Sequence, residues 1–170
     1  LKQSSLLSSS SSSSLSSADP PAAVVKDFME SVSRLLRVPD THLEVEIVHY
    51  KHGERYARHT DYRVHDVWRH GGIRLLSMYV AISNQTRGGN VGFPELGWLV
   101  VDEPQVLVWP NVAIVEEVEK EEAEEDNSNT HSYRRLPNMK NEQLPVVDGE
   151  LYAARIWVHE YIYNASNQCA

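Results

Sequence analysis

The chain has 170 residues, of which 41% are hydrophobic and 24% charged, as expected of one globular domain with a buried core. Its formal net charge of −8 and its lack of clustered Lys and Arg argue against a nucleic-acid partner. A lone cysteine, Cys169, excludes an internal disulfide framework and a Cys-rich zinc module. No apolar run reaches the roughly 18–20 residues of a membrane-spanning helix, although a sequence that begins at Leu1 leaves room for an upstream signal or anchor.

The first segment of the chain, residues 3–17, consists almost entirely of Ser and Leu. Its small apolar area does not offset the entropy lost on ordering, so we predict a flexible tail or linker over 1–21 and a folded domain over 22–170. Apolar residues then recur at helical spacing from Val24 to Leu36, and Asp19 before two prolines is a plausible helix start. This helix is expected to support a sheet.

Beyond this helix the pattern changes to short runs of Val, Ile, Tyr and Trp that are separated by Gly, Pro and Asn, which is typical of strands and turns. The predicted strands are Leu43–Tyr50, Arg74–Ile82, Gly97–Val101, Val106–Trp109 and Leu151–Tyr163. We therefore predict a mainly β domain with a supporting helix (α+β), folded as a double-sheet jelly roll. The acidic stretch Glu116–Asp126 is interpreted as a solvated loop, with attraction of basic peptides as the alternative.

The segment that carries chemistry follows the first predicted strand, where His59 and Asp61 are separated by one residue. Alternate residues of extended backbone share a face, so this pair can present an imidazole and a carboxylate to one ion. With a distal His, such a pair forms the facial triad of non-haem Fe(II) oxygenases. By itself the pair is a weak signal.

Spaced motifs around this pair resemble, in order, the catalytic domain of prolyl 4-hydroxylases, which are Fe(II)- and 2-oxoglutarate-dependent dioxygenases. The pattern Tyr-x-x-Gly-x-x-Tyr-x-x-His-x-Asp-Tyr occupies Tyr50–Tyr62, further matches follow it, and the resemblance as a whole covers residues 22–163. These later segments are Gly72–Ile82, Gly88–Pro94, Val106–Asn111, Pro145–Gly149 and the Trp157-x-His159 strand. The resemblance implies the double-stranded β-helix fold, Fe(II), 2-oxoglutarate, molecular oxygen and ascorbate. It also implies a proline-containing polypeptide substrate and a location in the endoplasmic reticulum or secretory pathway.

The resemblance assigns roles to individual positions, and three positions depart from the family pattern. His59 and Asp61 match the iron ligands, and Tyr50 matches the residue whose hydroxyl donates to 2-oxoglutarate. The departures are Asn141 at the position of the distal His, Leu151 at that of the 2-oxoglutarate Lys, and Val91 where a Thr is frequent. No catalytic residue beyond the metal site is assigned, and Tyr56 and Trp157 are expected to be structural neighbours of the site.

Other residues of the chain offer substitutes for the missing groups. Arg155 lies four residues after Leu151, so on a regular strand both side chains share a face, and a guanidinium suits a carboxylate. A surface or salt-bridged arginine is the alternative. His131 reaches the metal only if its polar loop folds inward, and His159 is expected to pack or hydrogen-bond rather than to ligate.

The sequence leaves three functions open. The first is a prolyl 4-hydroxylase-like dioxygenase. The second is a catalytically degenerate relative that binds Pro-rich extended peptides in the same groove, without iron. The third is a metal-independent partner subunit in which the acidic loop or the Ser-rich tail provides the contact.

Overall fold

The computed structural model describes residues 20–63, 70–83, 87–97, 106–115 and 133–163. The chain separates into two compact units, Leu1–Thr41 and His42–Ala170. No helix in these described ranges is both long and apolar enough to cross a bilayer. The acidic stretch 116–126, His131 and the whole Ser-rich segment 3–17 fall outside the described residues.

The helix α1 of the first unit spans Pro20–Leu36, which agrees with the predicted periodicity. Two prolines occupy its first turn, where a missing backbone N–H costs no hydrogen bond. The helix ends at Arg37, whose φ of 57° is left-handed, and the Val38 N–H returns to the Ser33 carbonyl at 3.2 Å. This is the ordinary way in which a helix satisfies its last carbonyls.

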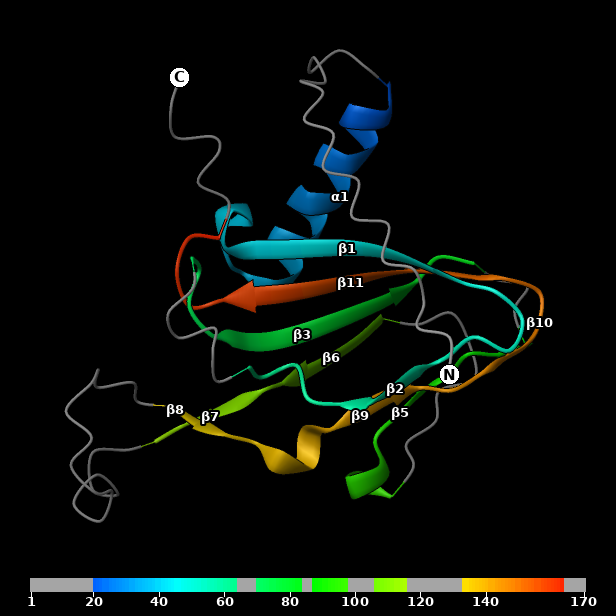
Figure 1. The fold of residues 1–170 in the computed structure, drawn as a ribbon. Helices are drawn as coiled ribbons and strands as arrows, with labels where there is room; N and C mark the ends of the chain where they lie inside the picture. The colour runs from blue at the N-terminus through cyan, green and yellow to red at the C-terminus, as the bar shows by residue number, and fades with distance from the viewer. Residues whose placement is uncertain (1–19, 64–69, 84–86, 98–105, 116–132, 164–170) are drawn as a thin grey trace. The chain divides into compact units, whose positions relative to one another are not determined.

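The second unit contains a four-stranded and a three-stranded antiparallel sheet (Figure 1). The four-stranded sheet has the order β1 (Leu43–Tyr50), β11 (Leu151–His159), β3 (Arg74–Ala81) and β6 (Val106–Pro110). The three-stranded sheet has the order β2 (Tyr56–His59), β9 (Asn141–Gln143) and β5 (Val91–Gly92). The remaining strands pair as β10 (Val146–Asp148) with β4 (Arg87–Gly88) and as β7 (Val112–Ile114) with β8 (Tyr133–Arg135). Short 3-10 helices occupy Asp40–His42, Pro94–Leu96 and Pro137–Met139.

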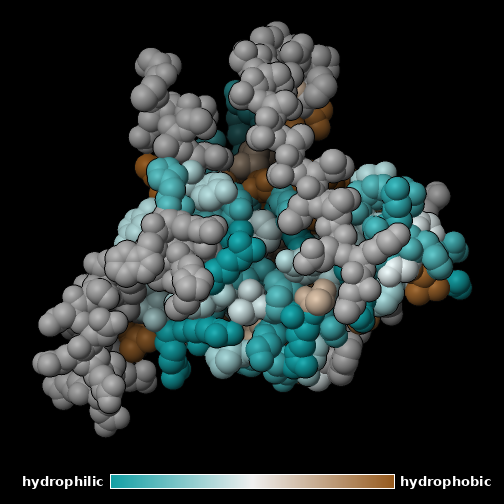
Figure 2. All heavy atoms as spheres, viewed as in Figure 1, coloured by the Kyte–Doolittle hydropathy of each residue, from teal (hydrophilic) through white to brown (hydrophobic). Residues whose placement is uncertain are grey.

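An aromatic cluster joins the two sheets. Tyr79, Trp109 and Ala153 of the four-stranded sheet pack with Val91 and Phe93 from the three-stranded side. The Phe93 and Trp109 rings meet edge to face, with their centroids 5.2 Å apart, which is a favourable arrangement for aromatic quadrupoles. On the face of the molecule seen in Figure 2 the described residues are mostly hydrophilic.

The predicted mainly β jelly roll is confirmed, and the strand ends differ in detail. Leu43–Tyr50 matches β1, and β3 ends one residue before Ile82. The strand β11 ends at His159 rather than Tyr163, because the chain turns where the Glu160 and Tyr161 N–H groups bond the Ile73 and Gly71 carbonyls. Gly97 caps a 3-10 helix with a φ of 84° instead of starting a strand, and 98–101 lie outside the described residues.

Two glycines with positive φ provide a matched test of the β4–β10 turn. Gly53 has a φ of 79° and nothing within 4 Å of an added Cβ, whereas at Gly88, with a φ of 76°, that Cβ would lie 2.6 Å from the Pro145 carbonyl oxygen. We expect Gly53→Ala to cost about 1–2 kcal/mol of unfolding free energy from backbone strain alone. Gly88→Ala should cost a further 1–3 kcal/mol, about the price of overpacking. Urea unfolding of both variants measures this, and equal losses would contradict the predicted clash.

Candidate functional site

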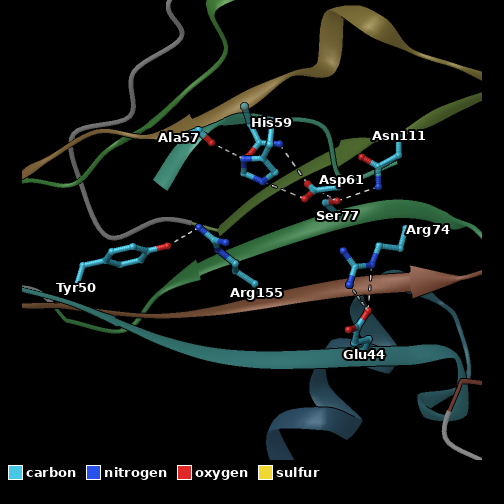
Figure 3. Close-up of polar contacts among 10 residues, drawn as sticks. Glu44, Tyr50, Ala57, His59, Asp61, Arg74, Ser77, Asn111 and Arg155 are labelled. Atoms are coloured by element: carbon cyan, nitrogen blue, oxygen red, sulfur yellow. Dashed lines mark hydrogen bonds and ion pairs between the residues drawn. The ribbon is translucent and has the colours of Figure 1, made fainter. Parts of the chain in front are cut away.

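The candidate site is a pocket between the two sheets (Figure 3). Its lining includes His59 and Asn141 from the three-stranded sheet, and Trp109, Arg155 and Trp157 from the four-stranded sheet. Asp61 enters the same pocket from the segment that follows β2. The sheet pairing brings together residues that are up to 98 positions apart in the sequence, as far apart as His59 and Trp157.

His59 and Asp61 lie side by side, as the sequence predicts. The His59 Nδ1 lies 2.8 Å from the Ala57 carbonyl oxygen, and a carbonyl only accepts, so Nδ1 carries the hydrogen. The Nε2 atom then faces the Asp61 Oδ1 at 3.3 Å. A lone pair against a carboxylate is repulsive, so a cation, either a proton on Nε2 or a metal ion, is required between them. A backbone carbonyl that accepts from the other ring nitrogen is a common feature of metal-ligating histidines.

Several donors surround the buried carboxylate of Asp61. Ser77 Oγ donates to Oδ2 at 2.9 Å, and Asn111 Nδ2 in turn donates to Ser77 Oγ at 2.9 Å. Burial raises the pKa of Asp61, but the hydrogen bond and charge of His59, with hydrogen bonds from Ser77 and Trp157, outweigh burial and lower it to about 2. The carboxylate therefore stays ionised at neutral pH.

Asn141, at the position expected for the distal ligand, stands opposite His59 across the β2–β9 pair. Its Nδ2 donates to the Asp61 Oδ2 at 3.2 Å. An Asn ligates a metal only through its carbonyl oxygen, which requires the amide to rotate. Among the described residues there is no group of three His, Cys, Asp or Glu suited to a metal ion.

Of the positions predicted to hold the co-substrate, Val91 and Arg155 line the pocket, and Tyr50 contacts Arg155. Leu151 is buried and packs with Tyr50 and Val146, so it contributes no charge. Val91 is buried in the aromatic cluster. Arg155 points to Tyr50, with Nη2 at 2.6 Å from the phenol oxygen, and lines the pocket. Leu151 and Arg155 both contact Tyr50, but the Leu151 side chain packs in the core whereas the Arg155 side chain lines the pocket.

The two predicted structural neighbours contact the site directly. The Tyr56 ring meets the His59 ring edge to face with centroids 4.2 Å apart. The Trp157 side chain hydrogen-bonds Asp61, and its ring lies under the Arg74 guanidinium, 3.8 Å from the ring centroid to Cζ. Both residues therefore orient the His–Asp pair.

His159 has the hydrogen-bonding role expected of it. Its Nε2 lies 2.9 Å from Glu44 Oε2, and its Nδ1 lies 3.2 Å from the Gly72 carbonyl oxygen. Arg74 also donates to the Glu44 carboxylate, through Nη2 at 2.6 Å. Burial raises the pKa of Glu44, but the hydrogen bond from His159 and the charge of Arg74 outweigh it, so the pKa is lowered. In this buried cluster the three side chains serve as one another's polar partners.

Sequence reasoning missed five residues of the pocket region that carry polar groups: Ser77, Tyr79, Trp109, Asn111 and Gln143. Gln143 Nε2 donates to the Tyr79 hydroxyl at 3.3 Å and also to the Gly89 carbonyl. The available signal was a single polar residue inside an apolar strand, as with Ser77, and the spacing of Asn141 and Gln143 on one strand face. Neither signal identifies the partner, because every partner comes from another strand.

Comparison with known proteins gives one consistent resemblance. In an alignment 156 positions long that covers 83% of this chain, the sequence is 25% identical to the probable prolyl 4-hydroxylase 8 of Arabidopsis thaliana. The chain spans 50% of that relative's length. A scan against models of protein families finds no match.

Solved structures agree with this resemblance at the level of the fold. The 2-oxoglutarate complex of the viral collagen prolyl hydroxylase from Paramecium bursaria Chlorella virus-1 superposes with a TM-score of 0.55 at 18% identity, covering 82% of this chain and 74% of that one. A Pseudomonas putida prolyl 4-hydroxylase gives a TM-score of 0.45 at 16% identity over 87% of this chain and 69% of that one. The chain thus resembles prolyl 4-hydroxylases in sequence, and its fold is that of the viral enzyme.

Proposed function

We propose that this chain is a prolyl 4-hydroxylase-like dioxygenase, dependent on Fe(II) and 2-oxoglutarate, that acts on prolines of a polypeptide. The single observation that carries the proposal is the His59–Asp61 pair. Its geometry demands a cation between Nε2 and Oδ1, which face each other at 3.3 Å. Imidazole and carboxylate are the ligand types of non-haem Fe(II) sites that keep positions open for oxygen and a co-substrate.

The residues present fit Fe(II) at two positions and offer a weaker third. His59 would contribute Nε2, Asp61 a carboxylate oxygen, and Asn141 its carbonyl oxygen after the amide rotates. When bound, the ion with 2-oxoglutarate and molecular oxygen supplies the oxidation of the proline C–H bond. The chain's own part is to hold the ion, to orient His59 through the Ala57 carbonyl, and to enclose the pocket between the sheets.

The substrate class is a proline-containing polypeptide, and the names of the Arabidopsis relative and of the viral collagen prolyl hydroxylase support this assignment. Ascorbate as a reductant and a location in the secretory pathway follow from the resemblance alone. Both are therefore parts of this proposal that rest only on the resemblance to prolyl 4-hydroxylases.

A second candidate function is a binding module for Pro-rich peptides that holds no iron. The contact that favours it is the one from Asn141 Nδ2 to Asp61 Oδ2 at 3.2 Å, because Asn141 turns its N–H side toward Asp61 and not the carbonyl oxygen that could ligate a metal ion. In this reading the cation between His59 and Asp61 is a proton. The two functions differ in a directly measurable property, namely affinity for Fe(II).

Anaerobic titration with Fe(II), with and without 2-oxoglutarate, distinguishes the two functions. We expect a visible metal-to-ligand charge-transfer band in wild type and its loss in His59→Ala. The matched control is His52→Ala, which removes an exposed imidazole seven positions earlier and should keep the band. If wild type gives no band at saturating iron, the dioxygenase function is wrong. Binding of a proline-rich peptide to the chelated protein would then support the module.

A further inference from the structure

Arg155 presents a half-buried guanidinium that has no acidic partner among the residues the structure describes. Its Nη2 donates to the Tyr50 hydroxyl at 2.6 Å, and its Cζ lies 4.3 Å from the Tyr56 ring centroid. Glu46 is its Cα partner across the β1–β11 pair, yet no ion pair joins the two side chains. A cation held by two tyrosines retains most of its five N–H donors for another acceptor.

A second donor on the same pocket is also without a partner. Trp109 Nε1 is buried and has no hydrogen-bond acceptor among the described residues, although Trp109 lines the pocket together with Arg155. Buried indole N–H groups usually have a partner, because an unmade hydrogen bond is costly. Both residues line the same pocket, and unused donors on lining residues fit a ligand that carries acceptor oxygens.

The Tyr50 hydroxyl is suited to share such a ligand. Burial raises the pKa of Tyr50 to about 12, although the charge of Arg155 acts in the opposite direction. The phenol therefore keeps its hydrogen at neutral pH. Because its oxygen accepts from Arg155, this hydrogen remains available for an oxygen of the ligand.

Asp61, the acidic residue of this pocket, does not form an ion pair with Arg155. Asp61 is paired with His59 and receives a hydrogen bond from Ser77 at 2.9 Å. In Figure 3 the Tyr50–Arg155 pair and the His59–Asp61 pair lie apart, and each carries its own interactions. The pocket thus has two separate parts: the His59–Asp61 pair, which suits a cation, and the Arg155 guanidinium, which suits an anion.

We propose that Arg155, together with Tyr50, is the carboxylate anchor of this pocket and that its ligand is a small organic acid. Under the proposed function, on which this identity rests, the acid is 2-oxoglutarate. Leu151 cannot contribute, because it packs between Tyr50 and Val146 in the core. The positive charge enters the pocket four residues later on the same strand, and its planar fork suits a bidentate contact with a carboxylate.

The test measures binding of glutarate and of 2-oxoglutarate to the metal-free protein in the presence of a chelator, by calorimetry. Glutarate has both carboxylates but lacks the keto oxygen that would chelate a metal, so it reports the anchor alone. We expect both acids to bind wild type and Arg155→Met to weaken both by at least about tenfold, as for loss of a charge-assisted contact. Arg135→Met, at an exposed arginine, should bind as wild type does.

A conservative variant separates anchoring from folding. Arg155→Lys keeps a positive charge at the same strand position and should retain part of the affinity that Arg155→Met loses. Unchanged acid binding in Arg155→Met, or no acid binding to wild type, would overturn the anchor. Acid binding that needs Arg155 in a protein without an iron band would leave the anchor standing and remove the dioxygenase function. An iron band with unchanged 2-oxoglutarate affinity in Arg155→Met would support the dioxygenase function and overturn the anchor.

Discussion

The Asn141→His variant is expected to bind Co(II) or Fe(II) at least about tenfold more tightly than wild type. The β2–β9 pairing places position 141 opposite His59, and Asn141 already contacts Asp61 at 3.2 Å, so an imidazole there can join the pair as a third ligand. Partners in the outer shell of metal sites alone change affinity about 10–100-fold, and a direct ligand should contribute no less. Absorption of Co(II), titrated against a competing chelator, measures the gain.

The control for this variant is Asn138→His, which adds the same imidazole to an exposed position of the Pro137–Met139 helix, three residues away. It should leave the metal affinity at the wild-type value. An equal gain in both variants would mean that the added imidazoles bind metal by themselves. No gain in Asn141→His would show that position 141 does not face the ion and would remove the geometric basis of the proposed site.

The Asp61→Asn variant is expected to lose about 2 kcal/mol of unfolding free energy at pH 7 in the presence of a chelator. The pKa of Asp61 lies at about 2 in the folded chain, against an ordinary value of 3.8, and each unit corresponds to about 1.4 kcal/mol. Since the folded-state pKa is lowered, this stabilisation is complete well above pH 3.8. It is lost as the pH falls through 3.8 toward 2, where the folded carboxylate is protonated.

The difference between wild type and Asp61→Asn should therefore shrink when urea unfolding is repeated at pH 3. Other acids titrate in this range, so only the difference between the two proteins is informative. The matched control, Asp27→Asn, changes an exposed carboxylate of α1 and should stay within about 0.5 kcal/mol of wild type at both values of pH. A pH-independent deficit in Asp61→Asn would indicate that packing, rather than charge, stabilises the native carboxylate.

Much of the fold could be predicted from the sequence because its signals are local. The apolar period from Val24 to Leu36 predicts α1, and the β-branched run Leu43–Tyr50 predicts β1 with the same bounds. The end of β11 at His159, four residues before Tyr163, could not be placed, because backbone hydrogen bonds to a distant segment turn the chain there. For β11 these are the bonds from Glu160 and Tyr161 to the Ile73 and Gly71 carbonyls.

The candidate site divides in the same way. The His59-x-Asp61 spacing and the replacement of the expected His and Lys by Asn141 and Leu151 are readable from the sequence, because residue identity and spacing decide them. A role for Arg155 could be suggested from its place four residues after Leu151. The sequence could not show whether the Arg155 side chain points to solvent, to an acidic partner or into the pocket, because side-chain direction and burial depend on the neighbouring strands.

The sequence by itself determined which groups are available to this pocket: one imidazole and one carboxylate two residues apart, an amide and an arginine. The tertiary structure alone decided how they are used. Packing of the two sheets sets Ser77 and Trp157 against Asp61. Within the described ranges it leaves Arg155 bonded to Tyr50 without an acidic partner, and the Trp109 N–H without an acceptor. The physical reason is that hydrogen bonding and burial are properties of contacts, and these contacts join strands that are far apart in the chain.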